Sequence, residues 1–212
     1  MEKLSLNKNW ICYVTGKRET QFATDVPHDA MLLDEKSETS AGGVNTGWIE
    51  AQDYTYERNL HISEKWNGKK LLLEFEGIYR KATVYVNRKK AAYHEYGYTG
   101  FYVDITESVN YGADNEIKVT VVNSDQPNSR WYSGTGIYRP VWLYIFPTEH
   151  ILRDEIRVKT LDYQKKKIAV DVKTTGVGML CTEIFDGEKL IVSKTIPVSY
   201  THLRAHETDS YL

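Results

Sequence analysis

The sequence contains few cysteines, and they are not arranged to build a site. Only Cys12 and Cys181 occur among the 212 residues, without a CxxC motif and without the spacing of metal ligands. A disulfide framework is therefore not expected. We predict that both thiols are free and buried as small apolar side chains.

Long uncharged apolar runs are missing as well, which excludes a transmembrane helix. The opening residues, MEKLSL, lack the apolar centre of a secretion signal, so we expect a cytoplasmic protein. The 27 basic and 29 acidic residues leave a net charge of -2 and form no basic block. Neither nucleic acid nor an anionic membrane is therefore an expected partner.

The sequence also lacks the apolar stripe of an amphipathic helix, and short strands take its place. Residues 71–76, 82–86, 101–105, 117–122 and 141–145 are β-branched or aromatic runs separated by turn residues. Apolar and polar side chains alternate through 82–86 and 117–122, which predicts one buried face for each of these strands. Residues 34–47 are rich in Ser, Thr, Gly and acidic side chains, which predicts a long surface loop. The fold class indicated is all-β with long loops.

The pattern changes after Pro147. Strands are expected at 156–159, 168–173 and 180–185, with tight turns at 165–167 and at 186–187. This hairpin-rich pattern indicates that a second β-sandwich follows the first.

Residues 128–142, NSRWYSGTGIYRPVW, are the most informative segment of the chain. Gly134 and Gly136 allow a positive φ or a close approach to another surface. Arg130 and Arg139 offer planar donors suited to carboxylates or sugar hydroxyls. We therefore expect a loop that is held in one conformation.

This segment closely resembles the loop that ends the N-terminal domain of glycoside hydrolase family 2, in which a GIYR or GIFR run precedes the last strand. Other motifs of that domain occur in the required order over residues 8–145: NKNW, DVPHDAML, YTYER, EGIYRKATVYVN, YGYTGFYVDIT and NEIKVTVVN. The family includes β-galactosidases and β-glucuronidases. The resemblance implies that residues 1–147 form a sugar-binding jelly-roll β-sandwich.

The resemblance further implies an immunoglobulin-like β-sandwich over residues 148–197. That fold needs about seven strands, and the sequence predicts fewer, so this domain is expected to be truncated. Residues 198–212 resemble translated sequencing-adapter read-through and are interpreted as an artefactual tail. His202 and His206 in this tail have the i, i+4 spacing of a metal pair, but no metal site is predicted there.

In this family both catalytic glutamates lie on a (β/α)8 barrel that follows the immunoglobulin-like domain. The sequence has no alternating βα pattern, so it is expected to hold no catalytic residue and no cofactor. We interpret the chain as the non-catalytic N-terminal part of a retaining β-glycosidase acting in carbohydrate metabolism, with the sugar substrate and the missing barrel as partners. The alternatives are a free-standing carbohydrate-binding sandwich and a sandwich that mediates homo-oligomer contacts.

The resemblance also places the loops of the jelly roll at the mouth of the barrel. Arg130, Trp131 and Tyr132 are therefore the candidate substrate-binding residues. Trp131 could stack on the face of a pyranose, and a plug at the domain interface is its alternative role. Some family members hold a cation with an acidic residue just before this tryptophan. Ser129 and Arg130 occupy those positions here, so no metal is predicted.

Other polar residues of the matched motifs are predicted to be structural. Arg139 is expected to pair with a buried carboxylate such as Asp104 or Asp29. His28 follows a proline, and we expect backbone hydrogen bonds to satisfy it at the start of a strand.

Two further expectations concern packing and one turn. The tryptophans expected in the core or at an interface are Trp10, Trp48, Trp66 and Trp142. Asn87 is expected to turn a hairpin because asparagine tolerates the left-handed conformation, with Arg88 in the place where the family often has glycine.

Overall fold

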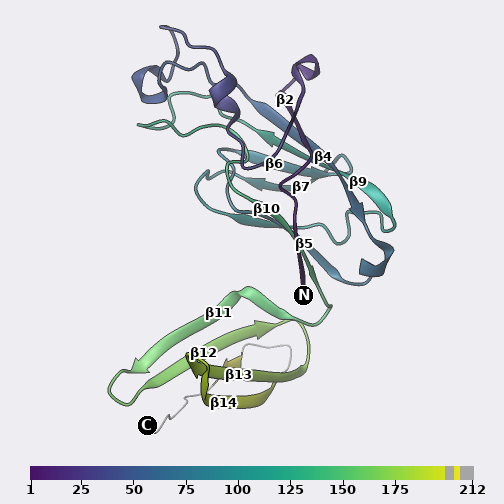
Figure 1. Ribbon diagram of the computed structural model, residues 1–212, viewed down its shortest axis with the longest axis vertical. Helices are drawn as coiled ribbons and strands as arrows, with labels where there is room; N and C mark the ends of the chain where they lie inside the picture. The colour runs from purple at the N-terminus through teal and green to yellow at the C-terminus, as the bar shows by residue number, and fades with distance from the viewer. Residues whose placement is uncertain (199–202, 206–212) are drawn as a thin grey trace. The chain divides into compact units, whose positions relative to one another are not determined.

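The computed structural model describes residues 1–198 and 203–205, and His202, His206 and most of the predicted tail lie outside them. The chain divides into two compact units, Met1–Ile145 and Phe146–Leu212. The expected boundary lay two residues later, after residue 147. Strands joined by turns and loops make up most of both units (Figure 1).

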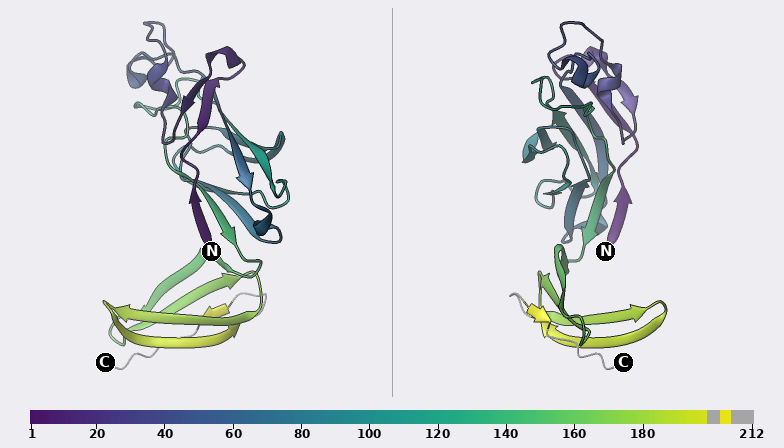
Figure 2. Two further views of the ribbon diagram at one scale, coloured as in Figure 1. Left: turned by 45° about the vertical axis from the view of Figure 1, so that its right-hand side comes forward. Right: turned by 90° about the vertical axis from the view of Figure 1, so that its left-hand side faces the viewer.

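The first unit contains ten strands that form two sheets. The strands are β1 (Glu2–Ser5), β2 (Trp10–Val14), β3 (Phe22–Thr24), β4 (Tyr54–Ile62), β5 (Lys70–Phe75), β6 (Ala82–Val86), β7 (Lys89–His94), β8 (Phe101–Asp104), β9 (Ala113–Val121) and β10 (Val141–Phe146). Six of them form one sheet in the order β3-β2-β4-β9-β6-β7, and the other four form a second sheet in the order β1-β10-β5-β8. Figure 2 shows this two-layered arrangement from two further sides. The all-β jelly-roll sandwich is thus confirmed.

One hydrophobic core fills the space between the two sheets. The inward side chains of β9, Ile117, Val119 and Val121, are completely buried, whereas Lys118 and Thr120 on its other face stay partly exposed. The predicted alternation along this strand is therefore confirmed. Burying each such aliphatic side chain contributes about 1.5–3 kcal/mol to folding.

The predicted hairpin turn joins β6 to β7. Asn87 and Arg88 both have positive φ angles, 48° and 68°. Two consecutive left-handed residues are the mark of a type I′ turn, which matches the twist of the flanking strands. The Asn87 side-chain amide donates to the carbonyl of Ser108 at 3.0 Å and to Asn115 Oδ1 at 2.7 Å, which holds this turn against the loop before β9.

Helical structure in the described part of the chain is limited to four short 3-10 helices. These are η1 (Arg18–Thr20), η2 (Ala30–Leu33), η3 (Gly43–Thr46) and η4 (Glu64–Trp66). The surface loop predicted over residues 34–47 contains η3. No helix among the residues that the structure describes is long and apolar enough to cross a membrane.

The second unit contains strands β11 (Ile151–Asp162), β12 (Lys167–Thr174), β13 (Gly178–Asp186), β14 (Lys189–Val198) and β15 (Leu203–Ala205). They form the sheets β11-β12-β15 and β13-β14. The predicted strands 156–159, 168–173 and 180–185 lie within β11, β12 and β13. Neither β14 nor β15 was predicted. The segment 198–212, in which no strand alternation was seen, does contain the short strand β15, because the free edge of β12 offers backbone partners to it.

Few apolar side chains of the second unit are buried. Val172, Leu180 and Val198 form its core, whereas Val158 and Met179 are exposed. Some strands of the first unit were also not predicted from the sequence. They include β1, β3 and β7. These are three of the four edge strands of its sheets, and an edge strand buries too few side chains to show a clear alternation.

Candidate functional site

Two loops far apart in sequence meet at the end of the first unit that lies opposite Met1 (Figures 1 and 2). Asp29 joins them. Its Oδ1 accepts from the backbone N–H of Met31 at 3.1 Å and of Thr135 at 2.9 Å, and its Oδ2 accepts from the Tyr132 hydroxyl at 2.6 Å. Partial burial and the adjacent Asp29 carboxylate raise the pKa of Tyr132 above its usual range, so this hydroxyl stays a donor.

The glycines of this loop allow its backbone to approach its neighbours closely. Gly134 and Gly136 have φ angles of 71° and 131°, as their predicted role required. A Cβ at Gly134 would lie 2.7 Å from Asp29 Oδ2, and one at Gly136 would collide with the Tyr56 hydroxyl and lie 2.9 Å from the carbonyl oxygen of His28. Gly136 also exchanges two backbone hydrogen bonds with Tyr79, at 2.9 and 3.0 Å. The loop is thus clamped on two sides.

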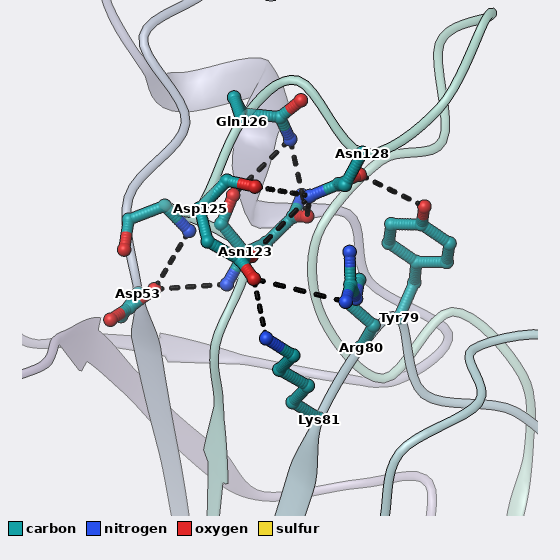
Figure 3. Close-up of polar contacts among 9 residues, drawn as sticks. Asp53, Tyr79, Arg80, Lys81, Asn123, Asp125, Gln126 and Asn128 are labelled. Carbon is teal, nitrogen blue, oxygen red and sulfur yellow. Dashed lines mark hydrogen bonds and ion pairs between the residues drawn. The ribbon is translucent and has the colours of Figure 1, made fainter.

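A buried asparagine supports the base of the same loop (Figure 3). Asn123 is completely buried, and its Nδ2 donates to the Gly134 carbonyl at 3.1 Å and to Thr135 Oγ1 at 2.6 Å. Its Oδ1 accepts from Asn128 Nδ2 at 2.9 Å, and its backbone N–H donates to Asp53 Oδ1 at 2.9 Å. One side chain therefore connects both ends of the loop.

The same network continues to the turn before β6 (Figure 3). The Tyr79 hydroxyl donates to Asn128 Oδ1 at 3.1 Å. Asp125 pairs with Lys81 at 2.5 Å and with Arg80 at 3.8 Å. Although partial burial acts in the opposite direction, these two cations lower the pKa of Asp125 below its usual value. The carboxylate is consequently held as an anion that fixes the loop.

The three predicted substrate-binding residues lie on the outer surface of this braced loop. Arg130 is exposed, Trp131 is 60% exposed and Tyr132 is 41% exposed. The Trp131 indole N–H donates to the Tyr98 hydroxyl at 2.9 Å. Tyr96 lies beside Tyr98, and both side chains are exposed. Neither tyrosine was predicted as a site residue, although the run YGYTGFY was a signal that could have indicated them.

His28 lies on the inner side of Asp29. Its Nδ1 is 2.8 Å from the Tyr56 hydroxyl, and its ring contacts those of Phe22 and Tyr56. Burial lowers the pKa of His28, since a desolvated imidazolium is disfavoured. The expected strand start and backbone partner for this side chain are wrong, because His28 lies between β3 and η2 and the Tyr56 hydroxyl is the partner of its ring. The backbone N–H of His28 donates to the Ile137 carbonyl at 2.8 Å.

The expected pairing of Arg139 with Asp104 or Asp29 is wrong. Arg139 is exposed, and its guanidinium lies 5.5 Å from the Tyr138 ring. Asp104 pairs with Lys70 from the neighbouring strand β5, and both oxygens of Asp29 are already occupied by donors of its own loops. Arg139 forms no ion pair with either carboxylate, and Asp104 is exposed rather than buried.

Two expectations about burial also need correction. Cys12 is buried and its pKa is raised by desolvation to about 12, as suits an inert thiol, but Cys181 is exposed on β13. Trp10 and Trp66 belong to the core, whereas Trp48 is exposed at a φ of 65°, so a place in the core is wrong for Trp48 and a place at an interface stays a prediction. Both exceptions lie where the local backbone carries the side chain outward, on the sparsely buried second unit and after the left-handed Gly47.

This end of the first unit exposes polar and aromatic side chains. In the described residues, no three His, Cys, Asp or Glu side chains are grouped so that they could hold a metal ion. Asp29 accepts three hydrogen bonds within the protein, so it is occupied as a structural acceptor. The loops present aromatic faces, hydroxyl groups and one free-standing guanidinium at Arg130 to solvent.

Comparison with known proteins agrees with this architecture. The galactose-binding-like domain of glycosyl hydrolase family 2 matches residues 11–141. A β-galactosidase of Bacteroides ovatus is 30% identical over an alignment that covers 81% of this chain and 21% of that protein. A β-glucuronidase of Bacteroides fragilis is 29% identical over an alignment that covers 93% of this chain and 30% of that protein.

The solved structures agree as well. A glycosyl hydrolase family 2 member from Bacteroides cellulosilyticus superimposes with a TM-score of 0.83 at 25% identity, over 98% of this chain and 30% of that one. The chain thus spans from about a fifth to a third of the length of these proteins. Because the family match covers more than half of the sequence and its fold agrees, the chain belongs to glycosyl hydrolase family 2, and its first unit is the galactose-binding-like domain of that family.

Proposed function

We propose that this chain is the non-catalytic N-terminal part of a retaining β-glycosidase with β-galactosidase or β-glucuronidase activity. The first unit is its sugar-binding domain, and the second unit is the beginning of an immunoglobulin-like domain. The partners are the carbohydrate substrate and a catalytic barrel encoded further along the same gene. Arg130, Trp131 and Tyr132 bound the sugar site from the side of the jelly roll.

The observation that carries this proposal is the set of hydrogen bonds that hold the loop of residues 128–136 in place. Asp29 and Asn123 hold residues 128–136 through hydrogen bonds that reach across more than one loop, while Trp131 and Tyr132 stay exposed. An exposed aromatic pair on a rigid backbone binds a ligand at a low cost in conformational entropy. The lengths of the relatives support the same conclusion, since the chain matches 21% of one and 30% of another.

A free-standing carbohydrate-binding module is the second candidate. The observation that favours it is the complete core of the first unit, which leaves that sandwich able to fold without a further domain. In this case the loop end would bind sugar alone, without any catalysis.

Sequencing the source DNA downstream of the codon for Pro197 distinguishes the two candidates. We expect the frame to continue into a βα-repeating barrel that carries two glutamates about 5 Å apart. The longer product should hydrolyse p-nitrophenyl β-galactoside or β-glucuronide, and replacing either glutamate with glutamine should abolish this activity. The 212-residue chain, assayed beside it, should show none. A genuine stop after Leu212 with no barrel behind it would overturn the glycosidase proposal.

A further inference from the structure

Strand β13 of the second unit offers a sheet edge of nine residues that has no neighbour. It pairs with β14 on one side, and the residues that the structure describes place no strand on its other side. Its sequence, GMLCTEIFD, contains no proline, lysine or arginine. The backbone N–H and C=O groups on the open side are therefore available to another extended chain.

Each of the other edge strands in the described sheets has a feature that hinders such pairing. Strands β1, β3, β8 and β15 have at most four residues. Strand β7 contains Lys89 and Lys90, and both β7 and β11 depart from a regular register with their neighbours. Strand β14 contains Pro197 and an extra residue, Ile191, that has no partner on β13. Short length, lysine, proline and bulges are the features that block edge-to-edge association, and β13 has none of them.

The order of side chains along β13 suits pairing with the same strand of a second copy. An antiparallel pair centred on Thr182 places Met179 opposite Phe185 of the second copy, on the exposed face of the sheet. On the other face it places Leu180 opposite Ile184. Apolar side chains thus meet on both faces, and no two like charges lie directly opposite each other.

The neighbouring registers fit less well. A pair centred on Cys181 places Met179 opposite the charged Glu183. A pair centred on Glu183 places the two carboxylates of this residue directly opposite each other, which is destabilising. A register that is shifted by a single residue joins the covered face of one copy to the exposed face of the other. The register centred on Thr182 is therefore favoured.

We propose that two copies of this chain pair through β13 and form a four-stranded sheet in the order β14-β13-β13-β14, with a two-fold axis beside Thr182. Met179 and Phe185, which are 67% and 53% exposed, are covered in this dimer and contribute apolar contact. The outer edges are the two β14 strands, whose Pro197 and bulge at Ile191 end the pairing, so association stops at two copies. One strand edge is a small interface, so the dimer is weak and depends on the concentration of the chain.

The first test is analytical ultracentrifugation of the 212-residue chain, in the presence of a reducing agent, at concentrations up to about 1 mM. We expect a monomer–dimer equilibrium. Met179→Lys and Phe185→Lys should each weaken dimerisation by about tenfold or more, because each removes apolar contact and adds a cation to the edge. Val158→Lys is the matched control, since Val158 is 64% exposed on β11 in the other sheet, and this variant should dimerise as the parent chain does. Far-ultraviolet circular dichroism verifies that the variants are folded.

A second test examines the register. In the proposed pair, Cys181 lies opposite Glu183 of the second copy, with Cβ atoms about 4.5–5.5 Å apart, so Glu183→Cys creates a thiol that can form a disulfide with it. Within one copy the two thiols would be roughly 7 Å apart along the strand, which is too far for a disulfide. Oxidised glutathione serves as the oxidant and is itself reduced. We expect a linked dimer on a non-reducing gel for Glu183→Cys. The parent chain and the double variant Cys181→Ser/Glu183→Cys, which each have one thiol on β13, should give little of it and measure random collision.

Four results would overturn the proposal. They are a chain that stays monomeric up to about 1 mM, species larger than a dimer, an equal weakening of association in Val158→Lys, and equal cross-linking of the single-thiol chains. The last result would mean that the thiols react by collision or in another register. The inference does not depend on the proposed function, because both tests use the 212-residue chain. A frame that continues into a barrel would leave their results unchanged.

Discussion

The hydroxyl of Tyr132 donates to Oδ2 of Asp29 at 2.6 Å, although 103 positions separate the two residues in the sequence. The same carboxylate also accepts from the backbone of Met31 and Thr135. One side chain therefore fixes the start of η2 and the exposed loop together. The loop that carries the candidate sugar contacts depends for its position on a residue of another motif.

This relationship predicts an energetic coupling between Asp29 and Tyr132. Tyr132→Phe should lower the free energy of unfolding by about 1 kcal/mol, since it removes a hydrogen bond to a charged acceptor at a partly exposed site. Asp29→Ala should cost about 2–3 kcal/mol because two backbone N–H groups also lose their acceptor. Urea unfolding of both single variants and the double variant measures the coupling, which we expect near 1 kcal/mol. Additive losses would show that the bond contributes nothing.

A substitution at Gly136 is predicted to have a larger effect on the free energy of unfolding. Gly136→Ala should cost about 3 kcal/mol or more, because it adds a collision with the Tyr56 hydroxyl and the His28 carbonyl to the strain of a positive φ. Gly16 is the matched control: its φ is 84°, yet nothing lies within 4 Å of the position a Cβ would take. Gly16→Ala should therefore cost only about 1 kcal/mol. Equal urea midpoints for the two variants would contradict the close packing at Gly136.

His28 predicts a loss of stability in mild acid. Burial lowers its pKa in the folded chain below the ordinary value of 6.5, so the unfolded chain binds more protons below that pH. The contribution of neutral His28 is complete above about pH 6.5 and declines as the pH falls toward the lowered pKa. Urea unfolding between about pH 7.5 and 5.5 should show this decline in the parent chain, and less of it in His28→Asn. His61→Asn serves as the control, because His61 is exposed. If the slope of the free energy of unfolding against pH changes equally in both variants, His28 is excluded as the source of the slope.

Four strands inside the sheets, β5, β6, β9 and β10, could be predicted from the sequence because burial on one face imposes a period of two, whereas the interior strand β2 was not predicted. In β9, Ile117 and Val119 point into the core and Lys118 lies between them on the other face, and this pattern is visible in the letters alone. Edge strands such as β1 lack a second neighbour and bury little, so their sequence, EKLS, carries no such period. The limit is therefore physical, since only buried side chains leave a pattern.

The candidate site could be predicted from the sequence only for features that the type of a single residue determines. Gly134 and Gly136 were expected to allow a positive φ or a close approach to another surface, and both have positive φ angles. The partner of Arg139 was mispredicted, since a partner depends on which strands become neighbours, and Lys70 from β5 lies closer to Asp104. Asn123 was overlooked for the same reason: asparagine suits turns, caps and buried networks alike until its surroundings are known.

The buried position of Asn123 predicts the largest effect of a nearly isosteric substitution. In Asn123→Asp, a carboxylate oxygen would face the Gly134 carbonyl and Thr135 in place of the amide that now donates to both. We expect a loss of about 3 kcal/mol or more in the free energy of unfolding at neutral pH, since the oxygen that replaces Nδ2 would oppose the Gly134 carbonyl in a buried site, while Asn128 would still donate to the other oxygen. Asn45→Asp is the matched control, because Asn45 is exposed in η3.

The cause of that loss can be isolated by changing the pH. Burial should raise the pKa of the new carboxyl above its unfolded value of about 3.9, so the folded variant binds the extra proton first as the pH falls. The deficit of Asn123→Asp relative to the parent chain should therefore shrink between about pH 7.5 and 5, whereas that of Asn45→Asp should not. A deficit that stays constant over this range would mean that lost packing, and not the buried charge, destabilises the variant. In that case the hydrogen bonds of Asn123 would be less important to the loop than their geometry indicates.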